Sequence, residues 1–183
     1  MTELGLLAES VRVSERTLRR AANRGTLRVI RKGPRRTLVS SEEHQYVLRC
    51  WPLVDRLLHE LRTLPNVRLA VLFGSVARGD DRPDSDLDVL VRLRQDGVRE
   101  RAHVAQRLES ATGRSLQLVL LDDAAREPSL LAEILRDGRV LVDRDGDWPE
   151  LKLREAGIGR EAERADRRLE QEAWAALEEL GVS

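Results

Sequence analysis

The spacing of hydrophobic and polar residues changes along the chain and divides it into three parts. In the first part, apolar residues recur every three or four positions, which predicts two short helices, the second beginning after Ser14 and ending at Gly25. Residues 26–31 and 36–39 then have the pattern of two short strands joined by a turn. Two helices separated by a tight turn and followed by a hairpin predict a winged helix-turn-helix.

The second part alternates short apolar runs with amphipathic stretches. Residues 69–73 are wholly apolar, which is typical of a strand that is buried on both faces. Further strands are predicted over residues 86–92, 114–121 and 139–142, and helices over residues 99–112 and 129–136. This part therefore contains both strands and helices.

A helical stretch links the first two parts. It begins at Ser40 or Ser41, and Pro52 either kinks it or opens a new helix. We place the three parts at residues 1–48, 49–146 and 147–183.

The third part is predicted to be a long helix over residues 150–180, broken near Gly157 and Gly159. Its narrow apolar stripe includes Leu169, and Trp174 lies beside that stripe. Such a stripe packs on the parent domain or pairs with a second copy as a homodimer, and both alternatives stay open.

Charge is balanced over the whole chain but not along it. The 183 residues contain 32 basic and 32 acidic side chains, yet residues 1–49 carry eleven basic and five acidic ones, a net charge of +6. The excess of basic residues is larger within residues 11–36, which contain ten basic residues and one acidic residue, Glu15. A basic segment of this kind indicates contact with nucleic acid, and we expect the DNA to be the promoter of the protein's own gene.

The basic segment supplies two groups of candidate DNA-binding residues. Those on the outward face of the second predicted helix are expected to reach base edges, and those of the wing to hold phosphates. The first group is Arg16, Arg19, Arg20 and Asn23, and the second is Arg31, Lys32, Arg35 and Arg36. The alternative is a solvated face on a module that binds only protein.

Several classes of protein are excluded by composition. No apolar run approaches the roughly 18–20 residues of a membrane-spanning helix, and the first residues lack the pattern of a secretory signal. The one cysteine, Cys50, excludes an internal disulfide framework and a cysteine-based zinc site. We therefore expect a soluble, cytoplasmic protein that does not contact a membrane.

The candidate chemistry lies directly after the apolar strand over residues 69–73. Gly74 and Ser75 form a strand-to-helix turn in which the glycine lets a phosphate approach the backbone and the serine donates to it. Asp86 and Asp88 are expected on one face of the next strand, where they suit Mg²⁺ bound to phosphates. Arg78 would neutralise further phosphate charge. The alternative is a solvated acidic turn without a ligand.

Residues 72–91 contain the motif of a known family. Leu-Phe-Gly-Ser-Val-Ala-Arg-Gly, followed by Ser-Asp-Leu-Asp-Val-Leu-Val, resembles the minimal nucleotidyltransferases of the DNA-polymerase-β superfamily, in which ten residues separate Gly-Ser from Asp-x-Asp. The resemblance covers about residues 53–145. It implies an α+β fold with a mixed sheet and flanking helices, ATP or another nucleoside triphosphate as substrate, and Mg²⁺ held by Asp86 and Asp88. The first 45 or so residues resemble the winged helix-turn-helix domains of bacterial regulators and excisionases.

The chain departs from the family pattern at one position. Active members carry a third carboxylate on a later, neighbouring strand, and the resemblance places Gln117 there. An amide ligates a hard cation weakly and cannot act as a base. Asp122 and Asp123 follow, and Asp123 is in phase with Gln117 only if the strand continues.

The resemblance leads to a leading function and two alternatives. It extends to the antitoxin halves of toxin–antitoxin modules, which implies a DNA-binding regulator that transfers AMP from ATP to a hydroxyl of a toxin-like partner protein. The first alternative, supported by Gln117, is a transcriptional regulator with an impaired nucleotidyltransferase fold that binds nucleotide or a partner without transfer. The second, transfer to an aminoglycoside, is weaker because the C-terminal helices leave little protein for an antibiotic-binding domain.

Overall fold

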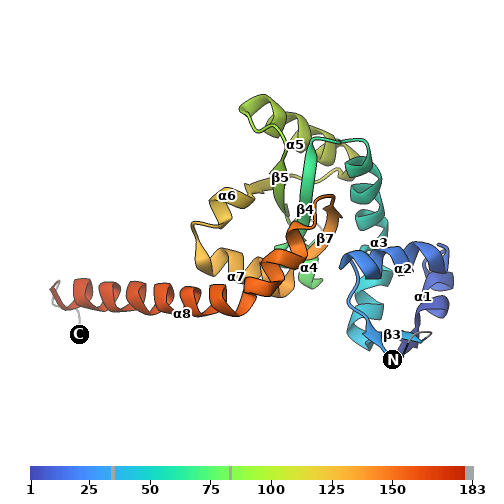
Figure 1. Ribbon diagram of the computed structural model, residues 1–183, viewed down its shortest axis with the longest axis horizontal. Coiled ribbons are helices and arrows are strands. Elements are labelled where there is room, and N and C mark those ends of the chain that lie inside the picture. Colours follow the sequence, from blue (N-terminus) through green and yellow to red (C-terminus); the bar gives the residue numbers. More distant parts are fainter. Residues whose placement is uncertain (34–35, 83, 180–183) are drawn as a thin grey trace.

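A computed structural model describes residues 1–33, 36–82 and 84–179 of the chain, the last four of them by backbone alone. Figure 1 shows a helical N-terminal module, a sheet with helices around it, and a long C-terminal helix that projects from the body. None of the helices in this description is long and apolar enough to cross a membrane.

The N-terminal module contains two helices and a small antiparallel sheet. Its elements are β1 (Thr2–Glu3), α1 (Leu4–Ser10), α2 (Glu15–Arg24), β2 (Ile30–Arg31) and β3 (Thr37–Val39), and the strand order is β1-β3-β2. Both predicted ends of α2 are confirmed, because the Ser14 hydroxyl accepts a hydrogen bond from the Thr17 amide and Gly25 is left-handed with φ 95°. The strands are shorter than predicted, and β1 was not predicted at all.

Helix α3 (Ser41–Arg62) runs from this module to the sheet without a break. The Ser40 hydroxyl accepts a hydrogen bond from the Glu43 amide, so the helix begins at one of the two predicted serines. Pro52 lies inside the helix, and the alternative in which it opens a new helix is wrong. Cys50, Trp51 and Val54 around it are buried, so packing offsets the hydrogen bond that proline removes.

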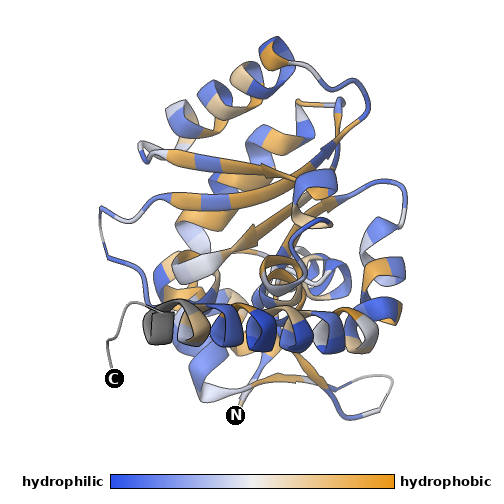
Figure 2. Cartoon of the chain, turned by 90° about the vertical axis from the view of Figure 1, so that its left-hand side faces the viewer, coloured by the Kyte–Doolittle hydropathy of each residue, from blue (hydrophilic) through white to orange (hydrophobic). Residues whose placement is uncertain are grey.

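The central sheet is mixed, as predicted. Its strands are β4 (Val67–Phe73), β5 (Leu87–Leu93), β6 (Leu116–Leu120) and β7 (Arg139–Asp143), in the order β6-β5-β4-β7. Strand β4 is antiparallel to both β5 and β7, whereas β5 and β6 are parallel. In Figure 2 these strands are mainly hydrophobic, as the apolar run over residues 69–73 predicted.

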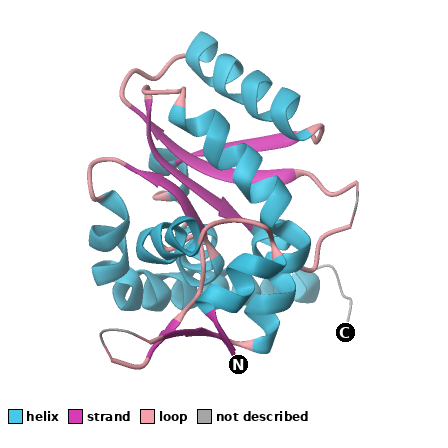
Figure 3. Ribbon diagram, turned by 90° about the vertical axis from the view of Figure 1, so that its right-hand side faces the viewer, coloured by secondary structure: helices cyan, strands magenta, loops and turns pink. Residues whose placement is uncertain are grey.

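Helices cover both faces of the sheet (Figure 3). They are α4 (Gly74–Arg78), α5 (Val98–Thr112), α6 (Leu121–Ala124), α7 (Pro128–Asp137) and α8 (Asp147–Glu179), in addition to α3. Ala70 and Leu72 belong to the buried cluster that contains the α3 and α5 side chains, and Val71 belongs to the cluster formed with α7 and α8. This alternation is the two-sided burial that a wholly apolar strand indicates.

Helix α8 is continuous from Asp147 to Glu179, so the predicted break near Gly157 and Gly159 is wrong. A side chain at either glycine would meet open space, whereas Ile158 between them is buried against α7. Packing of Ile158 therefore keeps the helix continuous across Gly157 and Gly159, although glycine is a weak helix former.

Arg139 joins the N-terminal module to the sheet. Its guanidinium is 2% exposed and donates two hydrogen bonds to the carboxylate of Glu43 on α3, at 2.7 and 2.9 Å. It also donates to the Ala77 carbonyl at 2.6 Å and to the Thr26 carbonyl, and it stacks on the Tyr46 ring at 3.3 Å. The first and second parts thus share one buried core, and the boundaries at residues 48 and 146 remain predictions.

We expect Arg139→Met to lower the free energy of unfolding by about 3–5 kcal/mol, because Glu43 then keeps a buried charge without its counter-ion. Denaturant titration measures this loss. Arg126→Met is the control, because Arg126 is 79% exposed and its pair with Asp123 is worth about 0.5 kcal/mol or less. Equal losses in the two variants would contradict the role given to Arg139.

Candidate nucleotide-binding site

The centre of the site is the turn between β4 and α4. Gly74 has φ 69°, a left-handed conformation that favours glycine. A Cβ atom built at this position overlaps the carboxylate of Asp88 on β5. Gly74 therefore serves two purposes, since it permits the turn and lets a carboxylate lie directly against the backbone.

Asp88 is the more enclosed of the two predicted carboxylates. It shares a sheet face with Leu90, which packs with residues of α7. Burial raises the pKa of Asp88 above its ordinary value, and the charges of Asp86 and Glu133 raise it further, against an opposing effect of Arg78. Asp86 is exposed and precedes the first residue of β5, so it lies at the mouth of the site and not within the strand as predicted.

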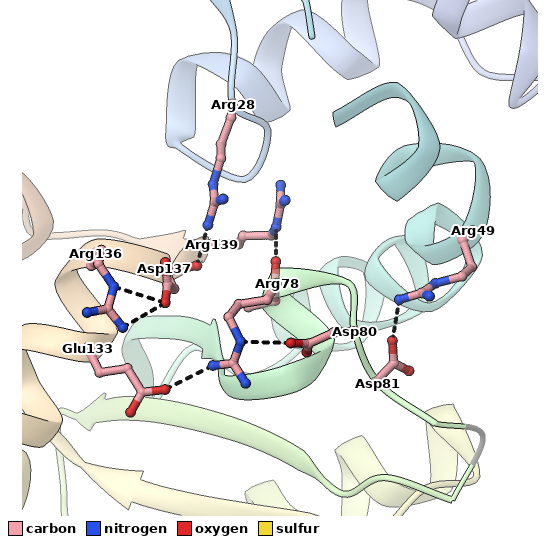
Figure 4. Close-up of polar contacts among 10 residues, drawn as sticks. Arg28, Arg49, Arg78, Asp80, Asp81, Glu133, Arg136, Asp137 and Arg139 are labelled. Carbon is pink, nitrogen blue, oxygen red and sulfur yellow. Dashed lines mark hydrogen bonds and ion pairs between the residues drawn. The ribbon is translucent and has the colours of Figure 1, made fainter. Parts of the chain in front are cut away.

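Ser75 and Arg78 lie at the two ends of the short helix α4. The Ser75 carbonyl accepts hydrogen bonds from the amides of Gly79 and Asp80, which closes the helix. The Arg78 guanidinium donates to Asp80 at 3.2 Å and to Glu133 of α7 at 2.9 Å (Figure 4). These contacts hold the predicted phosphate-binding arginine beside the carboxylate pair.

Glu133 was missed by the sequence reasoning. It lies on α7, 45 residues after Asp88 in the chain, and only the packing of α7 on the sheet brings the two together. No local motif marks it, because it is one acidic residue on an amphipathic helix.

Gln117 lies directly beside Asp88. The two residues are register partners across the parallel strands β5 and β6, so their side chains project from the same face. The strand ends at Leu120, and Asp122 and Asp123 lie on α6, so Asp123 does not continue the strand in phase with Gln117. The carboxylates after β6 therefore do not share the strand face of Gln117.

The residues fit a divalent cation that is shared with a phosphate. Within residues 1–33, 36–82 and 84–179, no three acidic, histidine or cysteine side chains converge as a closed metal site. Asp86 and Asp88 are close enough for the charge of one to raise the pKa of the other, and a cation between them would relieve that repulsion. Mg²⁺ is commonly held by one or two carboxylates together with substrate phosphates, which is the donor set available here.

The acidic loop after α4 has a structural role that the sequence did not reveal. Asp81 accepts hydrogen bonds from Arg49 of α3 at 2.6 Å and from both terminal nitrogens of Arg114 at 3.0 Å. Figure 4 shows the contact between Arg49 and Asp81 beside the contacts of Arg78 with Asp80 and Glu133. The start of the loop that leads to Asp86 is thus fixed to α3 and to the residues before β6.

The candidate DNA-binding residues that the structure describes are exposed. Those placed by the structure are Arg16, Arg19, Arg20 and Asn23 on α2, Arg31 on β2, and Lys32 and Arg36 between β2 and β3. Arg31 donates to the Asn23 side chain at 2.8 Å, which brings the α2 group and the strand group together. Arg19 pairs with Glu15, and Arg36 pairs with Glu3 at 3.2 Å. Arg35 lies outside the described residues.

The fold and the site define a class of protein. The family model described as "Polymerase beta, Nucleotidyltransferase" matches residues 55–147, which is half of the chain. The chain therefore belongs to the polymerase-β nucleotidyltransferase family. None of the curated proteins compared with the chain matches it by sequence.

Solved structures of toxin–antitoxin proteins have the same fold. A chain of a toxin–antitoxin structure with AMP-PNP is 22% identical to this chain. The match covers 66% of this chain and 98% of that chain, with a TM-score of 0.54. A chain of the structure of a tri-AMPylated Shewanella oneidensis HEPN toxin in complex with MNT antitoxin is 20% identical to this chain. The match covers 68% of this chain and 98% of that chain, with a TM-score of 0.51. At these identities the likeness establishes the fold.

We expect Gly74→Ala to destabilise the protein more than Gly113→Ala. Both glycines are left-handed, which costs alanine about 1–2 kcal/mol, but a Cβ at Gly113 meets open space. At Gly74 the added atom must also displace Asp88. The free energies of unfolding of the two variants measure the difference, and equal values would show that the close approach is not needed for the fold.

Proposed function

We propose that the chain is a Mg²⁺-dependent nucleotidyltransferase of the antitoxin type, which transfers AMP from ATP to a hydroxyl of a toxin-like partner protein. The observation that carries this proposal is the close approach of Asp88 to Gly74, which puts one carboxylate of the Asp-x-Asp pair against the Gly-Ser turn. Membership of the nucleotidyltransferase family supports the reaction class. The similar structures with AMP-PNP and with an AMPylated toxin support the choice of nucleotide and partner.

Each residue has a distinct task in this proposal. The backbone at Gly74 and the Ser75 hydroxyl hold the triphosphate, and Arg78 adds a positive charge. Asp86 and Asp88 would hold Mg²⁺, which when bound neutralises phosphate charge and orients the reacting group.

The transfer replaces one bond to the α-phosphorus by another. The acceptor oxygen bonds to the α-phosphorus of ATP, the bond to the bridging oxygen breaks, and pyrophosphate leaves. The acceptor proton needs a base, and Gln117 cannot provide one because an amide is not basic at neutral pH. In the proposed transfer, Asp88, the carboxylate beside Gln117 on the neighbouring strand, would accept that proton.

The position of Gln117 also favours a second function, a regulator that binds nucleotide without transferring it. An amide beside Asp88 leaves the turn and the carboxylate pair intact for binding but removes the family's third carboxylate. The two functions differ in whether the acceptor oxygen is activated.

We expect Gln117→Asp to raise the rate of AMP transfer to a co-purified partner by at least about tenfold, because it adds a carboxylate beside Asp88. The amount of label transferred from ATP to the partner measures the reaction. We expect this label to be lost in Asp86→Asn and in Asp88→Asn. Gln106→Asp on α5 is the control for added charge. If the wild type and Gln117→Asp bind Mg²⁺-ATP and neither transfers label, the non-catalytic regulator is the correct function.

We infer that α1, α2 and the β2–β3 hairpin form a winged helix-turn-helix that binds the promoter of the protein's own gene. The exposed basic residues on α2 and the contact between Arg31 and Asn23 support this inference, because they give the helix and the hairpin a common basic side. These residues contribute to the net charge of +6 over residues 1–49, which favours contact with the phosphates of DNA.

Arg16→Ala combined with Arg20→Ala is expected to weaken binding to the promoter by about tenfold or more, since both side chains are exposed on α2. Arg126→Ala with Arg160→Ala removes the same charge outside the N-terminal module. Gel-shift titration at fixed salt compares the pairs. The same affinity for both double variants would rule out groove reading by α2.

A further inference from the structure

Three arginines from separate parts of the chain line one cavity at the junction of the N-terminal module and the sheet. Arg24 is the last residue of α2, Arg62 is the last residue of α3, and Arg144 directly follows β7. The cavity has a volume of about 230 Å³, and α3 and β7 give it an apolar wall. Because α2 and α3 both contact β7 (Figure 1), the fold brings together three positive charges that are far apart in the sequence.

These charges are not neutralised by the protein. Arg24, Arg62 and Arg144 form no ion pair with the part of the chain that the structure describes. Asp143 also lines the cavity, but its carboxylate accepts hydrogen bonds from three backbone amides at the start of α8, at 2.9–3.2 Å. The acidic side chain in the cavity is thus committed to a helix end, and the arginines keep their donors for another group.

The arginines are close enough to affect one another. Burial lowers the pKa of the Arg24 guanidinium, and the charges of Arg62 and Arg20 lower it further. Arg144 is held at the cavity because its guanidinium donates to the Leu61 carbonyl at 2.9 Å. A cation in the last turn of α2 or of α3 complements the dipole of its own helix, but that effect does not require the two side chains to meet. An anion between them would relieve their repulsion.

The size of the cavity and its charge both suit a phosphate group. Guanidinium groups match phosphate oxygens in charge and in hydrogen-bond geometry. A volume of about 230 Å³ is smaller than the roughly 300–1,000 Å³ of pockets that enclose a whole small molecule, so one phosphate group fits and the rest of its molecule stays outside. Arg16, Arg20 and Arg24 are spaced four residues apart on α2, so they form one stripe that leads from the proposed DNA-binding face into the cavity.

We propose that Arg24, Arg62 and Arg144 form a phosphate-binding site, and that it takes a backbone phosphate of the DNA duplex bound to α2. The choice of DNA as the source of the phosphate rests on the proposed promoter binding, whereas the site itself does not. Arg62 and Arg144 lie outside the N-terminal module, so the duplex would be held by the sheet domain as well as by α2. A free phosphate compound offers the same chemistry and is the other source to be distinguished.

Salt-dependent binding of the full chain to the promoter tests the DNA source. We expect Arg62→Met to weaken binding at low salt by about fivefold or more and to reduce the slope of log affinity against log salt by about 1, because one phosphate contact is lost. Arg56→Met is the matched control, since it removes the same charge from an exposed position about 120° further around α3. Equal slopes for the wild type and Arg62→Met would exclude a DNA phosphate.

Pyrophosphate tests the site without DNA. At constant ionic strength and without Mg²⁺, we expect it to raise the melting temperature of the wild type and of Arg56→Met by at least about 2 °C more than that of Arg62→Met. This difference together with an unchanged salt slope would assign the site to a free phosphate compound. If the wild type does not bind the promoter, the proposed DNA binding fails and the pyrophosphate shift alone decides the site. An Arg62→Met variant that matches the wild type in both measurements overturns the proposal.

Discussion

The buried ion pair between Arg139 and Glu43 is the constraint on which the arrangement of the molecule depends. The Arg139 and Glu43 side chains are 2% and 4% exposed, and removing such charges from water costs several kcal/mol each. Only complete hydrogen bonding offsets that desolvation cost. The Arg139 guanidinium therefore requires Glu43, the Thr26 carbonyl and the Ala77 carbonyl in fixed places at once. Those partners lie on α3, after α2, and on α4, so one side chain sets how the basic module, the sheet and the Gly74 turn meet.

This constraint connects a basic module, with a net charge of +6 over residues 1–49, to a sheet that carries 15 basic and 17 acidic residues over residues 50–146. Net charge alone therefore brings little attraction between the two parts and defines no orientation. The Arg139 pair, together with the hydrogen bond from Arg28 to the Asp137 carbonyl at 2.8 Å, provides the orientation. The sheet that carries the site and the module that carries α2 are thus joined through one buried core.

The features that could be predicted from the sequence are those with local causes. The cap at Ser14, the left-handed Gly25 and the apolar run over residues 69–73 are each decided by a few neighbouring residues, and all are present. The Gly-Ser turn and the Asp-x-Asp spacing are likewise local, and they predict the family that the family model matches. Local rules failed where packing opposes propensity, as it does for Pro52 in α3 and for Gly157 and Gly159 in α8.

The parts of the site that could not be predicted are contributed by distant segments. Glu133 reaches Arg78 only because α7 lies across the sheet, and Asp81 is held by arginines that precede and follow it by about thirty residues. Charged residues in an arginine-rich sequence have many possible partners, and neither spacing nor composition selects among them. The tertiary fold makes that selection.

The position of β6 at the end of the sheet has a consequence for how a large substrate is chosen. Asp88 is separated from solvent on that side by a single strand, and the neighbouring Gln117 is exposed. A hydroxyl delivered to the carboxylate pair would therefore arrive over an open border and not through an enclosing channel. In the proposed transfer, selectivity for the acceptor protein would then depend on the shape and charge of the surface that docks around this edge.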